Sequence, residues 1–272
     1  MQDDRPIGVF DSGVGGLTVL KSLHERMPGE NLLYLGDTAR LPYGTKSSRS
    51  ILRYAIQAVA RLQQRNIKLL VVACNTASAV ALPELQQALS PLPVIGVVEP
   101  GAQAAIEQCP GGRHLVLATE ATVALQAYSK AIRRLDGAAT VTELACELLV
   151  ALAEEGWQQG AIAEGIIRRY LDPFLTMGDA GRPQSIILGC THFPILRQAI
   201  RAVVGDAVSM VDSARTTAAV VENHLREKGA GNDAGSGTLQ LLATDGARRF
   251  ARVGGSFLGA DLAADDIELI DL

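Results

Sequence analysis

Residues 70–76 of this chain read LVVACNT, and residues 186–192 read IILGCTH. Each stretch is an apolar run that ends in a cysteine and continues into polar residues. Short apolar runs of this kind are typical of strands that are buried on both faces of a parallel sheet. Open α/β sheets place their chemistry at the carboxyl ends of such strands. The two stretches therefore predict that Cys74 and Cys190 lie at equivalent edges of two similar units.

Strand-like and helix-like segments alternate along the rest of the chain. The patterns predict strands at 7–10, 32–35, 68–73, 94–98, 114–118, 139–144, 185–189, 208–211 and 238–243, and helices at 17–27, 48–64, 78–89, 101–108, 122–135, 193–203, 213–227 and 246–253. This alternation predicts an α/β fold with doubly wound parallel sheets. The order of segments repeats, so that the strand end at Asp11 corresponds to Thr119 and Cys74 corresponds to Cys190.

The repeat predicts two pseudo-symmetric domains with the active site in the cleft between them. We expect residues 1–98 plus 208–272 to form the first domain, which is then discontinuous. Residues 99–207 are expected to form the second. At 272 residues the chain is long enough for two such domains with cores of their own.

The composition excludes several classes of protein. The formal net charge is −4 and no run of Lys and Arg exceeds a pair, which argues against nucleic acid as a partner. The first six residues are acidic and no stretch reaches the roughly 18 apolar residues of a membrane helix, so we expect neither a secretory signal nor a membrane partner. We therefore expect a cytoplasmic protein. The four cysteines form no C-x-x-C motif, and a disulfide framework is not expected.

Three chemistries compete for the two matched thiols. A zinc site needs three or four ligands, and the only local ligand pair is Cys190 with His192, so no metal site is predicted. A Cys/His hydrolase needs one cysteine and leaves the second without a role. Proton transfer between two bases uses both, because a thiol with a reference pKa of about 8.5 can accept or donate near neutral pH. Two thiols on opposite sides of one carbon predict a racemisation.

Polar residues near the cysteines fit supporting roles. Asp11 is predicted at the same sheet edge as Cys74, and His192 follows Cys190 by two residues. The alternatives are a helix N-cap for Asp11 and a surface or capping histidine for His192. The glycine-rich loop 11–16 lacks the spacing of a dinucleotide site or a P-loop, but its backbone N–H groups suit a small carboxylate. Residues 37–45 form either a plain turn or a loop that covers the substrate.

Several longer strings carry a family resemblance. They are GVFDSGVGGLT (8–18), YLGDT (34–38) with PYG (42–44), ACNTAS (73–78) and LGCTHFP (188–194). With these strings in this order, the chain resembles the cofactor-independent aspartate/glutamate racemase family and, within it, the bacterial glutamate racemases. The resemblance implies two α/β domains that face each other across a cleft, and often a homodimer.

The resemblance also implies the reaction and the roles of single residues. It implies direct interconversion of L- and D-glutamate without any cofactor, which supplies D-glutamate for peptidoglycan synthesis and hence for cell wall biogenesis and cell shape. Cys74 is then expected to act on the D-enantiomer with help from Asp11, and Cys190 on the L-enantiomer with help from His192 and Glu154. The implied substrate contacts are Asp11, Ser12, Tyr43, Gly44, Asn75, Thr76, Thr119, Thr122, Thr191 and His192.

Two other functions remain open from the sequence. One is an aspartate racemase or a related two-cysteine isomerase of the same superfamily. The other is a non-catalytic protein that uses the cleft to hold an amino acid.

Overall fold

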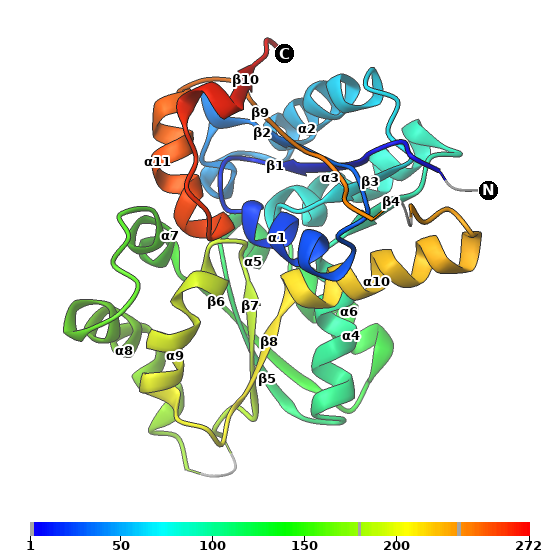
Figure 1. Ribbon diagram of the computed structural model, residues 1–272. Helices are drawn as coiled ribbons and strands as arrows, with labels where there is room; N and C mark the ends of the chain where they lie inside the picture. Colours follow the sequence, from blue (N-terminus) through cyan, green and yellow to red (C-terminus); the bar gives the residue numbers. More distant parts are fainter. Residues whose placement is uncertain (1–2, 179–180, 233–234) are drawn as a thin grey trace.

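The computed structural model describes residues 3–178, 181–232 and 235–272, and it is built around two parallel sheets (Figure 1). The first sheet has the strand order β10-β9-β2-β1-β3-β4 and the second has the order β6-β5-β7-β8. The strands of the first sheet are β1 (Ile7–Asp11), β2 (Leu32–Gly36), β3 (Leu69–Val72), β4 (Val94–Gly96), β9 (Leu239–Ala243) and β10 (Ile267–Leu269). Those of the second are β5 (Arg113–Ala118), β6 (Thr140–Ala145), β7 (Ser185–Gly189) and β8 (Ser209–Asp212). Two parallel-sheet α/β units confirm the predicted fold class.

The two sheets share one local strand order. In the first sheet β1 pairs with both β2 and β3, and β4 follows β3. In the second, β5 pairs with both β6 and β7, and β8 follows β7. The chain therefore reverses its direction of winding between β1 and β3 and again between β5 and β7. Open α/β sheets bind ligands outside the carboxyl ends of the strands at such a point.

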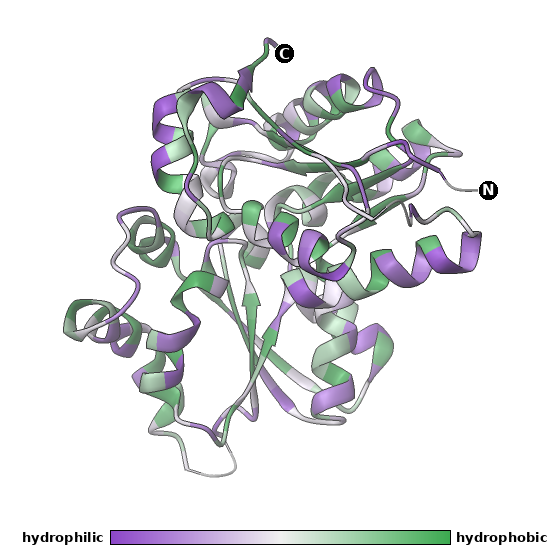
Figure 2. Ribbon diagram, in the orientation of Figure 1, coloured by the Kyte–Doolittle hydropathy of each residue, from purple (hydrophilic) through white to green (hydrophobic). Residues whose placement is uncertain are grey.

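Helices cover both faces of each sheet because alternate strand residues point to opposite sides. Val9 packs with α1 (Leu17–Arg26) and α11 (Ala247–Leu258), whereas Phe10 packs with α2 (Ser48–Gln63) and α3 (Asn75–Leu89). The second sheet is covered on one face by α4 (Val98–Gln108) and α6 (Ala127–Leu135), and on the other by α7 (Glu147–Glu154), α8 (Ala161–Leu175) and α9 (Arg197–Val204). Figure 2 shows hydrophobic residues along the strands and hydrophilic turns on peripheral helices such as α10 (Ser213–Lys228).

The single helix predicted over 122–135 is wrong. The structure has a short helix α5 (Glu120–Ala124) and then α6, which begins at Ala127. Gln126 between them has a left-handed backbone with φ 51°, a conformation that interrupts a right-handed helix. Glutamine has no strong preference for this conformation, so the break leaves no local signal in the sequence.

The expected return of the chain to the first domain at residue 208 needs correction. Strand β8 pairs in parallel with β7, so residues 209–212 belong to the second sheet. Helix α10 then lies against α1 and α4 and carries the chain back toward the first sheet. We keep the division into two domains as a proposal, with the return placed after Asp212. The strand pattern at 208–211 was visible in sequence, but its choice of sheet depends on the tertiary structure.

One apolar core joins the two sheets. It includes Val9 and Tyr34 from the first sheet and Leu115 and Leu188 from the second. The carboxyl ends of both sheets are thus held against each other by packing as well as by the chain crossings. Within the described residues no helix is long and apolar enough to span a membrane.

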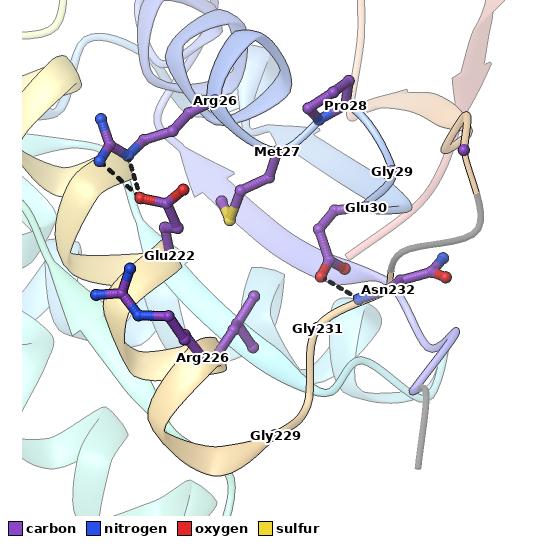
Figure 3. A pocket seen from close by; sticks show the side chains of 12 residues that line it. Arg26, Met27, Pro28, Gly29, Glu30, Glu222, Arg226, Gly229, Gly231 and Asn232 are labelled. Carbon is purple, nitrogen blue, oxygen red and sulfur yellow. Dashed lines mark hydrogen bonds and ion pairs between the residues drawn. The ribbon is translucent and has the colours of Figure 1, made fainter.

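A buried ion pair holds the segment after α10 against the first sheet. Lys68 Nζ lies 2.6 Å from Glu30 Oε2, and the two side chains are only 1% and 4% exposed. Nζ also donates to the carbonyl of Ala230, and Glu30 Oε1 accepts from the backbone N–H of Asn232 at 2.7 Å. Figure 3 shows the hydrogen bond between Glu30 and Asn232, which lies beside a surface groove of about 670 Å³ between the ends of α1 and α10. This pair is remote from the strand ends that carry the cysteines.

Candidate active site

The residues predicted for the site lie at the switch points of the two sheets. Asp11 ends β1 and Cys74 follows β3, while Thr119 follows β5 and Cys190 follows β7. All four are at most 7% exposed. Direct contacts join the two sets, because Thr191 Oγ1 lies 3.5 Å from Asp11 Oδ1 and Thr76 Oγ1 lies 2.9 Å from Thr119 Oγ1. The candidate site residues of the two sheets therefore lie next to each other in one site.

Cys74 caps the amino end of α3. Its Sγ accepts from the backbone N–H of Ala77 at 3.4 Å and donates to Ser12 Oγ at 3.4 Å. Burial, together with the negative charge of Asp11, raises the pKa of Cys74 to about 12. Charge on Cys190 contributes to the same rise, so the two sulfurs lie within electrostatic reach of each other. These surroundings favour the neutral thiol form of Cys74.

Cys190 has a different neighbour. Its Sγ lies 3.7 Å from His192 Nδ1, and His192 Nε2 lies 3.1 Å from Glu154 Oε1. Burial alone would lower the pKa of His192, but its bonds to Cys190 and Glu154 raise it to about 10. The bond to His192 also holds the pKa of Glu154 below its usual range. A cationic imidazole favours negative charge on an adjacent sulfur, so the two thiols sit in opposite electrostatic settings.

Asp11 contacts both halves of the site. Its Oδ2 accepts from the backbone N–H of Gly13 at 2.8 Å, and its Oδ1 faces Thr191. Burial raises the pKa of Asp11, although the charge of His192 and the hydrogen bonds oppose the rise. The alternative role of Asp11 as a helix N-cap does not apply, because the residue at the N-cap of α1 is Gly16.

The glycine-rich loop permits the close approach of the two halves. A Cβ on Gly15 would lie 2.4 Å from Thr191 Oγ1 and 2.5 Å from His192 Nδ1. A Cβ on Gly16 would lie 2.5 Å from the Cβ of Asp11. Real Cβ atoms do not tolerate such distances, so side chains at these positions would push the loop away from the second sheet. The loop thus serves close packing of backbone against the site, a role that the sequence pattern did not reveal.

Three buried threonines form a hydroxyl cluster between the halves. Besides the contact of Thr76 with Thr119, Thr122 Oγ1 lies 3.4 Å from Thr76 Oγ1 and 3.1 Å from Thr119 Oγ1. Thr76 comes from α3, whereas the other two come from the end of β5 and from α5. Each hydroxyl both donates and accepts, so the cluster can turn donors toward an anionic ligand.

Loop 37–45 is anchored over the same edge. Tyr43 is buried and its hydroxyl donates to Asp37 Oδ2 at 2.5 Å, while Arg40 Nε donates to the same oxygen at 2.7 Å. A Cβ on Gly44 would lie 2.8 Å from the Cβ of Thr119. The loop therefore reaches from the first sheet to the second, which agrees with a covering loop rather than a plain turn.

Sequence reasoning missed Tyr128. This buried residue of α6 donates from its hydroxyl to Asn75 Oδ1 at 2.7 Å. The bond fixes the side-chain amide of Asn75, whose buried Nδ2 has no partner among the described residues. Nothing in the local pattern marks Tyr128, since its partner lies 53 positions away. The N–H groups of Asn75 Nδ2 are therefore donors available to a ligand.

The stability contributed by His192 is expected to depend on pH. Its pKa of about 10 in the folded protein exceeds the ordinary value of 6.5, so protonated His192 stabilises the fold fully below pH 6.5 and loses this effect as the pH rises toward 10. We expect His192→Gln to reduce the urea midpoint most below pH 6.5 and least near pH 10. His24→Gln on the exposed side of α1 serves as the control. A midpoint difference that stays constant over this range would contradict the protonated state.

Comparison with known proteins places these features in a family. Residues 7–221 match the family model described as Asp/Glu/Hydantoin racemase. The chain is 46% identical over 263 residues to the glutamate racemase of Geobacter metallireducens, which covers 95% of this chain and 94% of that protein.

Solved structures of glutamate racemases are also similar to this chain. The glutamate racemase isoform RacE1 from Bacillus anthracis superposes with a TM-score of 0.93 at 35% identity, covering 100% of this chain and 99% of that one. The glutamate racemase from Francisella tularensis in complex with D-glutamate superposes with a TM-score of 0.89 at 34% identity, covering 98% of each chain. By these matches over nearly its whole length, the chain belongs to the Asp/Glu/Hydantoin racemase family.

Proposed function

We propose that this protein is a glutamate racemase that interconverts L- and D-glutamate. The observation that carries the proposal is the pair of buried cysteines at matching switch points, with the charge of Asp11 acting on Cys74 and His192 beside Cys190. The near full-length similarity to glutamate racemases, one of them solved with D-glutamate, supports glutamate as the substrate.

The proposed reaction uses side chains of this chain. When L-glutamate is bound, a Cys190 thiolate takes the α-hydrogen as a proton, and the electron pair of the C–H bond stays on the α-carbon. The Cys74 thiol donates its proton to the opposite face, which forms the D-enantiomer and leaves Cys190 as the thiol and Cys74 as the thiolate. The reverse reaction starts from that state, so Cys74 takes the proton from D-glutamate and Cys190 donates its own. Asp11 assists proton movement at Cys74, and His192, held by Glu154, assists it at Cys190.

Substrate binding is proposed for residues around the two thiols. The buried Nδ2 of Asn75 and the hydroxyl cluster of Thr76, Thr119 and Thr122 offer donors to a carboxylate, whose negative charge grows as the α-proton leaves. The remaining proposed contacts are Asp11, Ser12, Tyr43, Gly44, Thr191 and His192. The described residues contain no group of three or more His, Cys, Asp or Glu arranged to hold a metal ion.

We propose further that the D-glutamate supplies peptidoglycan synthesis in the cytoplasm and that the protein acts as a homodimer. Family membership supports these assignments. Light scattering of the purified protein tests the homodimer directly.

The function is tested by incubating the purified protein separately with L- and D-glutamate in heavy water that contains a metal chelator. Both solutions are expected to lose optical activity and to converge on a racemic mixture, with one deuterium at the α-carbon of the product. Aspartate under the same conditions is expected to remain optically active. Racemisation of aspartate alone would favour the aspartate racemase, and binding of glutamate without deuterium exchange would favour the non-catalytic protein.

A further inference from the structure

A chain of four side chains leads from the surface to Cys190. Arg249 Nη2 lies 2.6 Å from Glu154 Oε2, and Glu154 Oε1 lies 3.1 Å from His192 Nε2. His192 Nδ1 in turn faces the sulfur of Cys190 at 3.7 Å. A single carboxylate thus divides its two oxygens between a guanidinium and the imidazole beside the thiol.

The first link of this chain joins the two halves of the molecule. Arg249 lies on α11, which connects β9 to β10 of the first sheet, whereas Glu154 ends α7 after β6 of the second. In Figure 1 helices α7 and α11 lie on the same side of the molecule. The ion pair can form only while these two helices are together.

Glu154 and Arg249 differ in exposure. The Glu154 side chain is 16% exposed and the Arg249 side chain is 54% exposed. An ion pair with one such exposed partner contributes little to folding stability. We therefore expect the ion pair with Arg249 to act by holding Glu154 in place, and Glu154 in turn to hold His192.

The surroundings of the pair allow Glu154 to move when it is not held. A cavity of about 250 Å³ lies beside it, with Val14, Leu41 and Phe250 among its lining residues. His192 itself is confined, because its ring packs edge-on against Phe257 of α11 at a centroid distance of 5.2 Å. The titratable groups that act on His192 are Cys190 from its own loop, Glu154 from α7 and Asp11 from β1.

We infer that Arg249 is a positioning residue for the Cys190 half of the site. By holding Glu154 Oε2 it keeps Oε1 on His192, so an arginine of the first half helps to orient His192 in the second half. The inference deepens the proposed function and rests on it. It predicts that proton transfer at Cys190 depends on an arginine that does not touch the reacting atoms.

The test compares Arg249→Gln with Arg248→Gln, an exposed neighbour on the same helix that matches the change in charge. Arg249→Gln is expected to lower kcat about tenfold, the effect of a barrier about 1.4 kcal/mol higher. KM should change much less, because Arg249 does not bind the substrate. The acidic limb of the pH profile should move to higher pH, since Arg249 helps to hold the pKa of Glu154 below its usual range. Arg249→Lys should restore most of the kcat, and Arg248→Gln should behave as the unmodified protein.

A second measurement needs no substrate. The chain has four histidines, so the imidazole nitrogens of His192 can be followed by NMR as the pH is raised. His192 is expected to titrate at lower pH in Arg249→Gln than in the unmodified protein or in Arg248→Gln. An unchanged titration, or a loss of kcat that appears equally in Arg248→Gln, would overturn the inference. Absence of racemisation in the unmodified protein would refute the proposed function, while the titration would still test the positioning.

Discussion

Cys74→Ser and Cys190→Ser are each expected to lower kcat for glutamate racemisation by about 10²- to 10⁴-fold, the range that one positioned general acid or base contributes. A serine hydroxyl occupies nearly the same space as a thiol but is a much weaker acid, so it neither donates nor accepts the α-proton at the required rate. Cys109→Ser is the matched control, because Cys109 is a free cysteine at the end of α4 and away from both switch points. Stopped incubations with each enantiomer, resolved by chiral chromatography, measure the effect.

The two variants should differ in a reaction that needs only the first step, removal of the α-proton by one base. A glutamate analogue with a leaving group on the β-carbon needs only one base, because loss of the α-proton is followed by departure of that group. Cys74→Ser is expected to eliminate only from the L-analogue and Cys190→Ser only from the D-analogue. Failure of both eliminations despite normal binding, or racemisation by either variant at the rate of the control, would contradict independent bases at Cys74 and Cys190.

Lys68→Met is expected to lower the free energy of unfolding by about 3–5 kcal/mol, the cost of leaving a buried charge without its partner. The lysine ammonium and the Glu30 carboxylate are almost fully enclosed, so the remaining carboxylate would have neither water nor a cation to stabilise it. The loss should also release the segment around Ala230 and Asn232, which the two side chains hold by backbone contacts. Urea unfolding followed by circular dichroism measures the change.

The double variant Lys68→Met with Glu30→Gln sharpens this prediction. Removing both charges leaves a neutral amide that can still accept from Asn232, so much of the lost stability should return. Lys130→Met, which removes an exposed lysine, should change the unfolding free energy by less than about 0.5 kcal/mol. If Lys68→Met lowers the free energy of unfolding as little as Lys130→Met does, the Lys68–Glu30 ion pair does not stabilise the fold. Racemisation by folded Lys68→Met should be unchanged, because the pair lies far from the cysteines.

The different surroundings of the two thiols have a chemical consequence. Cys74 contacts a hydroxyl and a backbone N–H, and its pKa is raised to about 12. Cys190 faces His192, whose pKa is raised to about 10 although the ring is buried, so that this imidazole can be protonated. In the proposed conversion of L- to D-glutamate the Cys74 thiol donates a proton while the Cys190 sulfur accepts one, and these surroundings suit those two roles. The pseudo-symmetry of the fold positions the thiols equivalently, and their unlike neighbours make them complementary.

Local sequence patterns predicted the elements that carry the site. The apolar runs before Cys74 and Cys190 became β3 and β7, and the strand before Asp11 became β1, because hydrophobic periodicity within a segment directly reflects burial of that segment. Polar residues directly after such strands were expected at the active edge. The structure places them there, while their roles in catalysis stay predictions.

Contacts between distant segments could not be predicted in this way. The pairing of β8 with β7, the hydrogen bond from Tyr128 to Asn75 and the ion pair of Arg249 with Glu154 each depend on which elements become neighbours. The last of these joins residues 95 positions apart. The local sequence around either residue of such a pair does not indicate which distant residue it will contact.

The sequence by itself determined the fold class, the two matching strand ends and the pair of thiols. These features depend only on short segments of the chain, because the burial of a strand and the residues at its end are both visible in the local sequence. Only the tertiary structure decided which half β8 joins, how closely the glycine-rich loop approaches Thr191 and His192, and which cation holds Glu154. These depend on the distance between segments that the chain brings together only after both sheets have formed.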